Sequence, residues 1–578
     1  MVKKLWEARP SLKKSSILYR YEKFISKKYS QKFHQNYKRL LKWSINNSDL
    51  FWSTIWDFCK VKGVKGKQKL KKSNTFYKNV FLPNSRLSFT ENLLSKNDHS
   101  KALTFISENG FREERSWKQL RTNVSKLIIF FKKIKIKEKD RVAAYMPNIN
   151  ETVECFLSTS AIGAIWSSCS PDFGINGVIE RFSQIKPKVL FVVDRYFYNG
   201  KEINVIERIP EILKKIKSIQ YLIIVNYPGE KYIRKKYKLN KVKIFFWNDI
   251  KKIKFKKINF KEFDFEKELA ILYSSGTTGK PKCICHKSGG VLLQHLKEHQ
   301  LHCDIKENDN VFYFTTCGWM MWNWLVSALA SKASIVLFDG FPMYKKDDLL
   351  FKIAQNEKIT LFGVSAKYID QLRKLKIKIK SKFKLNYLKT ICSTGSPLSD
   401  DNFQYVYDNI KRNVHLASIA GGTDLVSCFV LGNIYSPVYK GQIQNNGLGM
   451  NTDVFSDKGK SLINKKGELV CKTPFPSMPK LFWNDKNNKK YKKAYFNRFK
   501  NIWHHGDYAE RKKNGGYIIY GRSDATLNPG GVRLGTAEIY SVVEKFKNVK
   551  ESIVVGQSWD NDIRIVLFLV LNKPNSLD

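Results

Sequence analysis

The segment from residue 269 to residue 282 concentrates groups that bind phosphate. An apolar run, Leu269-Ala-Ile-Leu-Tyr273, leads into a loop with two glycines, four hydroxyl side chains and two lysines. Glycines let backbone N–H groups turn toward an anion, hydroxyls donate to phosphate oxygens and lysine supplies charge. The glycines stand too close together for a Walker A loop, and an ordinary flexible Ser/Gly turn is the alternative. The residues predicted to bind phosphate are Ser274, Ser275, Gly276, Thr277, Thr278, Gly279 and Lys282.

Four segments further along the chain combine glycine with polar side chains at expected strand ends. They are 393–398 (Ser-Thr-Gly-Ser-Pro-Leu), 420–424 (Ala-Gly-Gly-Thr-Asp), 503–507 (Trp-His-His-Gly-Asp) and 521–533, which begins Gly-Arg-Ser-Asp. Each segment alone is a weak signal, because a turn with a structural aspartate has the same composition. Their order along the chain, together with the phosphate loop, is much more specific.

In that order the five segments resemble the core motifs of the adenylate-forming acyl-CoA synthetase superfamily. Within the superfamily, the chain is most similar to members that act on acetoacetate. That closer resemblance is carried by residues 163–174 (Gly-Ala-Ile-Trp-Ser-Ser-Cys-Ser-Pro-Asp-Phe-Gly), 186–190, 315–323, 416–424 and 521–540. It extends from Leu5 to Leu571 and implies an enzyme, an AMP-forming acid–thiol ligase. ATP and Mg²⁺ would activate acetoacetate as an adenylate, and CoA would then accept the acetoacetyl group.

The resemblance also implies a role for each matched residue. Asp507 would accept from both ribose hydroxyls, a task that suits the two oxygens of a carboxylate, and Arg522 would assist it. The residues implied to contact adenine are Gly395, Ser396, Pro397, Gly421 and Gly422. The residues implied to act on the reacting phosphates are Thr277, Lys282, Thr423, Asp424 and Arg533, and those implied to border the CoA pantetheine are Gly530 and Gly531.

Two positions depart from the pattern of relatives. Asp424 stands where a glutamate that holds Mg²⁺ is commoner, and its shorter side chain favours a metal held through water; a loop-capping aspartate is the alternative. Gly421 stands where related acetyl-CoA synthetases carry a tryptophan, which implies a larger acyl pocket. Trp319, Trp322 and Trp324 line that pocket or the CoA tunnel, or pack in the core. Asp524 falls at the hinge position of the superfamily.

Alternating elements must position these residues. Apolar runs at 141–145, 189–193, 221–225 and 335–338 alternate with helical patterns such as Trp117 to Phe131, which predicts an α/β fold with parallel strands. Residues 226–267 are predicted to be a lysine-rich connector.

The predicted domains are an N-terminal helical extension (1–100), a large adenylate-forming domain of several subdomains (101–521) and a partial small α+β C-terminal domain (522–578). A Pro-x-Thr-x-x-Gly-Lys motif expected beyond this point is absent from the sequence. The sequence therefore predicts a C-terminally truncated enzyme with weak adenylation.

Charge and cysteine content exclude several other classes. Lys and Arg total 103 against 51 Asp and Glu, a net charge of +52. The lysines are spread along the whole chain, and the densest basic runs, 60–72, 251–257 and 373–384, contain almost no Arg and no regular interleaving of aromatics, so no specific nucleic acid partner is expected. Ten cysteines without a C-x-x-C pair predict reduced thiols and no zinc site.

The N-terminus lacks the apolar region of a secretory signal. The uncharged stretch 310–331 contains enough polar residues to favour a buried segment over a membrane span, so a cytoplasmic protein is predicted.

Two other functions stay open at this stage. A ligase for another short-chain acid would use the same motifs, and a truncated remnant could bind nucleotide without full activity. A basic RNA-binding protein is a third class, which a steep salt dependence of binding would reveal. The oligomeric state is left open by the sequence.

Overall fold

The computed structural model describes residues 2–231, 242–274, 280–523, 527, 536–543, 545–546, 548–559 and 562–572. Several predicted site residues lie outside the described residues: Ser275, Gly276, Thr277, Thr278, Gly279, Asp524, Gly530, Gly531 and Arg533.

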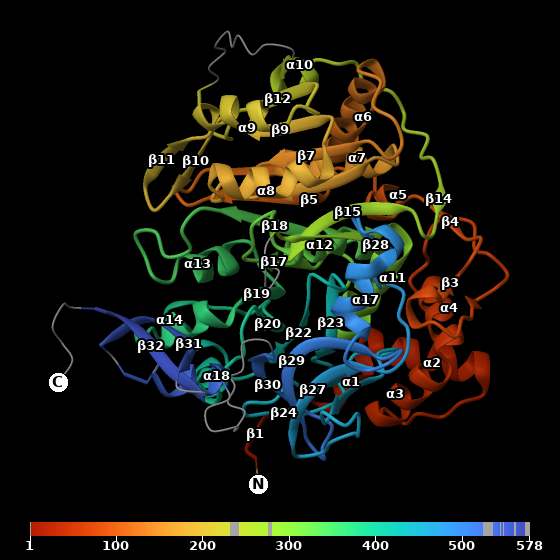
Figure 1. Cartoon of the computed structure of the whole chain (residues 1–578), viewed down its shortest axis with the longest axis vertical. Helices are drawn as coiled ribbons and strands as arrows, with labels where there is room; N and C mark the ends of the chain where they lie inside the picture. The colour runs from red at the N-terminus through yellow and green to blue at the C-terminus, as the bar shows by residue number, and fades with distance from the viewer. Residues whose placement is uncertain are drawn as a thin grey trace.

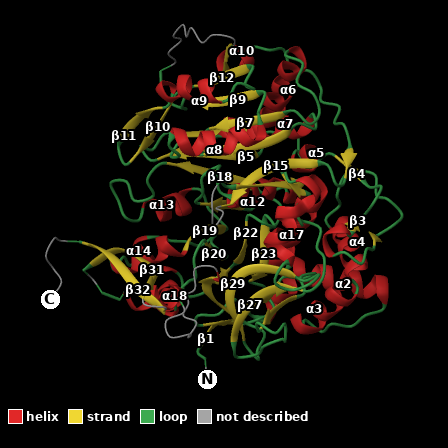
Figure 2. Cartoon of the chain, in the orientation of Figure 1, coloured by secondary structure: helices red, strands yellow, loops and turns green. Residues whose placement is uncertain are grey.

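Two large, mainly parallel sheets form the body of the protein (Figure 1). The first has eight strands in the order β13, β12, β9, β7, β8, β15, β16, β28. The second has seven in the order β21, β20, β19, β17, β18, β5, β6. Helices cover the faces of these sheets (Figure 2), so the predicted α/β class is confirmed.

The strands of the first sheet are β7 (Arg141–Tyr145), β8 (Ile165–Cys169), β9 (Val189–Val193), β12 (Tyr221–Val225), β13 (Lys243–Phe246), β15 (Glu268–Ser274), β16 (Lys282–Lys287) and β28 (Leu481–Phe482). Those of the second are β5 (Lys101–Ser107), β6 (Arg112–Ser116), β17 (Asn310–Tyr313), β18 (Ser334–Asp339), β19 (Leu361–Ser365), β20 (Thr390–Thr394) and β21 (His415–Ser418). The helices around them are α5 (Phe89–Leu93), α6 (Trp117–Lys133), α7 (Asn150–Ala161), α8 (Ile175–Ile185), α9 (Ile209–Lys215), α10 (Trp247–Lys251), α11 (Ser288–Leu296), α12 (Met320–Ser327), α13 (Leu349–Asn356), α14 (Ala366–Lys374), α15 (Ile379–Lys382) and α16 (Asp400–Tyr405).

The sequence explains these elements locally. Strand β9 is a continuous run of Val, Leu and Phe, and every residue of it is buried, as expected of a central parallel strand. Helix α6 begins at a capping box in which Ser116 and Gln119 satisfy each other's backbone N–H groups, and one face of the helix is buried. The stretch 310–331 forms β17, α12 and a 3₁₀ turn in the core, which confirms the predicted buried segment.

The prediction of a connector over residues 226–267 is wrong in part. Strand β13 pairs in parallel with β12 and extends the first sheet, and α10 follows it. Strand β14 (Phe263–Asp264) pairs with β4 (Arg86–Leu87). The apolar run Ile244-Phe-Phe246 is short and has lysines on its N-terminal side, so its strand character was masked by the charged neighbours.

Smaller sheets complete the fold. An antiparallel sheet contains β26 (Thr452–Phe455), β27 (Lys466–Cys471), β29 (Trp503–Arg511) and β30 (Tyr517–Arg522). A second contains β22 (Ala420–Gly422), β23 (Ser427–Leu431) and β25 (Asn445–Asn446). Pairs of strands are formed by β2 (Leu70–Lys71) with β3 (Val80–Phe81), and by β10 (Arg195–Tyr198) with β11 (Lys201–Asn204). Helix α17 (Lys489–Phe496) precedes β29, and α18 (Thr536–Val543), β31 (Val549–Trp559) and β32 (Asp562–Leu571) follow β30.

The first hundred residues share the core of the large sheets. They form β1 (Lys4–Trp6), α1 (Pro10–Ser15), α2 (Ile17–Tyr29), α3 (Tyr37–Asn46) and α4 (Ser48–Phe58). Strand β1 pairs with β24 (Val438–Tyr439), and the Tyr37 hydroxyl donates to the Asn446 carbonyl at 2.6 Å. Phe51, fully buried in α4, lies so close to Gly449 that a side chain there would overlap its ring. The predicted domain boundaries and the hinge at Asp524 stay predictions. None of the helices in the described part of the chain has the length and apolar character needed to cross a membrane.

We predict that Phe51→Ala lowers the free energy of unfolding of the whole protein by about 3–5 kcal/mol, because the residual cavity lies in the shared core. Urea unfolding followed by circular dichroism and by tryptophan fluorescence should give coincident transitions. Val2→Ala, at a half-exposed position, is the control and should change stability little. An early, separate transition confined to residues 1–100 would contradict the shared core.

Candidate functional site

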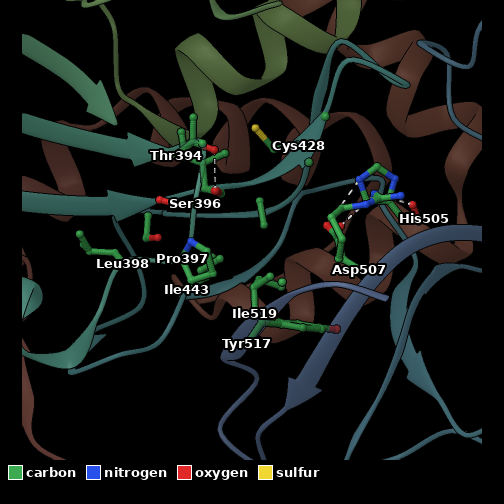
Figure 3. Close-up of a pocket in the computed structure, with 18 of the residues that line it drawn as sticks. Thr394, Ser396, Pro397, Leu398, Cys428, Ile443, His505, Asp507, Tyr517 and Ile519 are labelled. Carbon is green, nitrogen blue, oxygen red and sulfur yellow. Dashed lines mark hydrogen bonds and ion pairs between the residues drawn. The ribbon is translucent and has the colours of Figure 1, made fainter. Parts of the chain in front are cut away.

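A cavity of about 570 Å³ lies where the two large sheets meet the two smaller antiparallel sheets. Figure 3 shows Ser396 and Pro397 on one side of it and His505 and Asp507 on the other. Every predicted site residue that the structure describes lines this one cavity: Ser274, Lys282, Gly395, Ser396, Pro397, Gly421, Gly422, Thr423, Asp424, Asp507 and Arg522. Segments that are far apart in the sequence therefore form a single site.

One wall of the cavity follows the carboxyl end of β20. Gly395 has a φ of +95°, a conformation that favours glycine, and it turns the chain away from the strand. The Thr394 hydroxyl donates to the Ile419 carbonyl at 2.9 Å and joins this turn to the segment before β22. The turn exposes the backbone around Ser396 and Pro397 to the cavity, where a flat ring could lie.

The opposite wall carries an aspartate and an arginine from paired strands. Asp507 on β29 is opposite Arg522 on β30, and Arg522 Nη1 donates to Asp507 Oδ1 at 3.0 Å. The same nitrogen donates to the His505 carbonyl at 3.0 Å, which fixes the guanidinium. His505 Nε2 lies 3.6 Å from Asp507 Oδ2. The carboxylate is thus held in place while it borders the cavity.

A third cluster surrounds the carboxylate of Asp424, between β22 and β23. Lys282 Nζ lies 3.8 Å from Asp424 Oδ1, and the Tyr495 hydroxyl donates to the same oxygen. The Tyr495 ring stacks on Trp503 with centroids 3.8 Å apart and planes 14° apart, so its hydroxyl has little freedom to move. Burial raises the pKa of the Asp424 carboxyl, but the charge of Lys282 and the Tyr495 hydroxyl, among other groups, outweigh burial and hold that pKa below its ordinary value.

Tyr495 was missed by the sequence analysis. It lies in α17, within the run Lys489-Lys-Tyr-Lys-Lys-Ala-Tyr-Phe496, which contains no glycine or acidic residue to suggest a site. Its contact with Asp424 joins residues 71 positions apart. The helical period of that run places Tyr491 and Tyr495 on one face, but this pattern alone does not mark a functional site.

Gly421 and Gly422 of β22 form a further wall of the cavity. A Cβ at Gly421 would lie 2.1 Å from the Ser427 carbonyl oxygen and 2.6 Å from Cys428 Cα, both backbone atoms of the paired strand β23. Any larger residue there requires the β22–β23 pair to move. Replacing Gly421 with tryptophan would therefore disturb the β22–β23 pair, and any change in acyl binding would not report on pocket size alone.

The tryptophans of α12 and its N-cap divide between cavity and core. Trp319, Met320 and Met321 line the cavity, whereas Trp322 and Trp324 are fully buried and do not. These three side chains make this end of the cavity apolar, and Cys428, labelled in Figure 3, also lines the cavity.

The histidines near the cavity are poorly suited to accept protons at neutral pH. Burial lowers the pKa of His286 to about 3, although Asp424 acts in the opposite direction. Burial also lowers the pKa of His505 below its ordinary value. His504 instead pairs with Glu468 at 2.9 Å. Within the described residues, no group of three or more His, Cys, Asp or Glu side chains has the arrangement of a metal centre.

Comparisons with known proteins show which family the chain belongs to. Residues 93–479 match the family model described as AMP-binding enzyme. The chain is 47% identical over 531 residues to the acetoacetyl-coenzyme A synthetase of Rhizobium meliloti, covering 92% of this chain and 81% of that protein. It is 40% identical over 586 residues to the acetoacetyl-CoA synthetase of Danio rerio, covering 99% and 86%. The solved structure of acetoacetyl-CoA synthetase from Streptomyces lividans superposes with a TM-score of 0.92 at 33% identity, over 100% of this chain and 88% of that one.

We predict that Tyr495→Phe lowers the free energy of unfolding by about 1–3 kcal/mol at pH 7, because a buried carboxylate loses a donor while the ring stacking is kept. Chemical denaturation measures this change. Tyr491→Phe is the matched control, because its hydroxyl makes a long bond of 3.4 Å to the Pro479 carbonyl. If both variants lower the free energy of unfolding equally, the hydrogen bond from Tyr495 to Asp424 contributes no more to stability than that of Tyr491.

We also predict a pH effect at His286. The imidazole titrates near 6.5 when unfolded and near 3 when folded, so the unfolded state binds the extra proton and stability is lost as pH falls below 6.5. Burial raises the pKa of Asp339 and of Glu154 to about 7, so these two carboxyls make the folded protein more stable as pH falls. The effect of His286 is therefore measured as the difference in stability between a His286 variant and the parent protein.

His286→Leu should gain stability relative to the parent by up to about 1.4 kcal/mol per pH unit between pH 6 and pH 4. Urea midpoints measured across that window give the difference. A constant difference from pH 7 to pH 4 would mean that His286 titrates normally in the folded protein.

Proposed function

The chain belongs to the AMP-binding enzyme family, and from this we propose that it activates acetoacetate with ATP and transfers the acetoacetyl group to CoA. ATP and CoA are the substrates that the family implies. The observation that carries the proposal is the lining of the single cavity. Polar groups, among them Asp507 and Arg522, and apolar side chains, among them Trp319 and Met320, border the same space.

The reaction has two steps. In the first, a carboxylate oxygen of acetoacetate attacks the α-phosphorus of ATP, the bond to the β-phosphate oxygen breaks, and pyrophosphate leaves. In the second, the CoA sulfur attacks the acyl carbon of the adenylate, the thiol loses its proton, and AMP leaves. The acid is already ionised at neutral pH, so the first step needs no general base. This fits a cavity whose histidines are held at lowered pKa.

Each described residue would contact a different part of the nucleotide, according to its position in the cavity. Asp507, fixed by Arg522, would accept from the ribose hydroxyls. The backbone at Ser396 and Pro397 would border the adenine. Lys282 and Thr423 would then lie beside the phosphates, where a fixed cation offsets the repulsion between an attacking carboxylate and a triphosphate.

Asp424 would hold Mg²⁺. Its carboxylate is a hard anionic ligand of the kind that Mg²⁺ prefers, it borders the cavity, and its lowered pKa keeps it ionised. With one carboxylate present among the described residues at this point, water and phosphate oxygens would complete the coordination, which is usual for Mg²⁺. When bound, the ion would neutralise phosphate charge.

A ligase for another short-chain acid remains the alternative function. The apolar end of the cavity, with Met320, Met321 and Cys428, would also suit other short acyl chains. The relatives named above favour acetoacetate. A panel of acids distinguishes these functions. The predicted cytoplasmic location stays a prediction.

The experiment is to supply ATP, MgCl₂ and CoA with acetoacetate, acetate, butyrate or no acid, and to measure thioester and AMP. We expect both products with acetoacetate, in equal amounts, and less with the other acids. Faster turnover of a different acid would establish the alternative ligase. Binding of AMP without turnover of any acid would instead identify a nucleotide-binding remnant.

We predict that Asp507→Ala weakens AMP binding about ten- to hundredfold, because charge-assisted bonds to the ribose hydroxyls are lost. Isothermal titration measures the dissociation constant. Asp457→Ala removes an exposed aspartate that pairs with Arg498 at 2.6 Å and should leave AMP affinity unchanged. Unchanged AMP affinity in Asp507→Ala would refute the role given to Asp507.

A further inference from the structure

A buried ion pair lies directly behind the apolar end of the cavity. Lys297 and Glu298 are adjacent in a π-helical turn, Lys297–His302, that continues α11. Both side chains are fully buried, and Lys297 Nζ lies 3.3 Å from Glu298 Oε1. Such a pair is expensive to bury and often contributes little to stability. π-Helical turns are rare and are frequently found at functional sites.

The Glu298 carboxylate connects two elements that border the cavity. On one side, Trp324 Nε1 of α12 donates to Glu298 Oε2 at 2.9 Å. On the other side, the Cys428 backbone N–H of β23 donates to Glu298 Oε1 at 3.3 Å, and the Ser427 hydroxyl donates to the same oxygen. Helix α12 supplies Met320 and Met321 to the cavity, and β23 supplies Ser427 and Cys428. One carboxylate therefore accepts hydrogen bonds from both of these walls.

A second bridge runs parallel to the first. His295, one turn earlier in α11, contacts Ser327 Oγ of α12 at 2.9 Å and the Val426 carbonyl at 2.6 Å. Burial lowers the pKa of His295 below its ordinary value. Because a carbonyl only accepts, Nε2 donates to the Val426 carbonyl, while Nδ1 lies within hydrogen-bonding distance of Ser327 Oγ. Val426 has a φ of +48°, which is strained for a β-branched residue. The turn before β23 is thus held in an unfavourable conformation by its surroundings, a feature that clusters at functional sites.

We propose that Glu298, held by Lys297, is a positioning residue that sets the width of the acyl end of the cavity by tying β23 to α12. The proposal rests on the proposed function, since it assigns the walls of the acyl pocket. The carboxylate touches neither nucleotide nor acid. It acts through Ser427, Cys428 and Trp324. Because Gly421 is packed against Ser427 and Cys428, a shift of β23 would also move the glycine wall.

The test compares the affinity of AMP with that of a non-hydrolysable acetoacetyl-adenylate analogue by titration calorimetry. The ratio of the two dissociation constants gives the contribution of the acetoacetyl group to binding, called the acyl contribution below. In Glu298→Gln the acyl contribution should fall about tenfold while AMP affinity changes less than about twofold. Unfolding of each variant is measured in parallel.

A double variant separates positioning from stability. Lys297→Met with Glu298→Met removes both charges, and such apolar replacements of buried pairs often restore stability. If Glu298 positions the walls, stability returns in the double variant while the acyl contribution stays low. If the acyl contribution returns together with stability, the pair is merely structural and the proposal is overturned. Equal weakening of AMP and of the analogue would also overturn it.

Glu154→Gln is the matched control. Glu154 is a fully buried carboxylate 3.3 Å from Arg115 Nε, and it does not line the cavity. This variant should keep the acyl contribution, whatever the change in stability. A parent protein whose affinity gains nothing from the acetoacetyl group would refute the proposed function and, with it, the role of Glu298. Failure of the proposed function is thus seen in the parent protein, whereas failure of the Glu298 proposal alone is seen only in the variants.

Discussion

A buried carboxylate destabilises a protein unless cations and donors surround it, and the cavity of this enzyme depends on three that are so surrounded. Asp507 is paired with Arg522, Asp424 with Lys282 and Tyr495, and Glu298 with Lys297. In each case at least one partner comes from another element. Each carboxylate therefore joins separate parts of the chain, and the positions of the walls follow from these pairings.

The two large sheets provide the rigid part of this arrangement. Parallel strands β20 and β21 end at the same edge, where the turn at Gly395 and the segment before β22 face each other. The smaller antiparallel sheet brings β29 and β30 to the opposite side. The cavity thus lies at the carboxyl end of parallel strands, the usual place for ligands in open α/β sheets. Residues of both large sheets and of the two smaller antiparallel sheets border the cavity, so motion of any of these sheets would change the site.

Much of the fold and part of the site could be predicted from the sequence. Runs such as Tyr221 to Val225 are apolar throughout and correspond to the buried strand β12. The described motif residues line one cavity because each motif combines glycine turns with polar groups at a strand end. The strand β13 was not predicted, since lysines precede its short apolar run.

Residues that act through tertiary contacts could not be found in the same way. Tyr495 and Glu298 reach their partners across 71 and about 130 positions, and nothing in their neighbourhoods marks them. At Gly421 the absence of an indole predicted only a larger pocket. The backbone of Ser427 and Cys428, which leaves no room for a side chain without movement of β23, could not be foreseen from the sequence.

The most direct test of the account is a crystal structure of the protein with bound AMP. The account predicts electron density in the described cavity, with the ribose hydroxyls within hydrogen-bonding distance of Asp507 and the adenine beside Gly395, Ser396 and Pro397. AMP bound elsewhere, or bound in the cavity with the ribose away from Asp507, would contradict it.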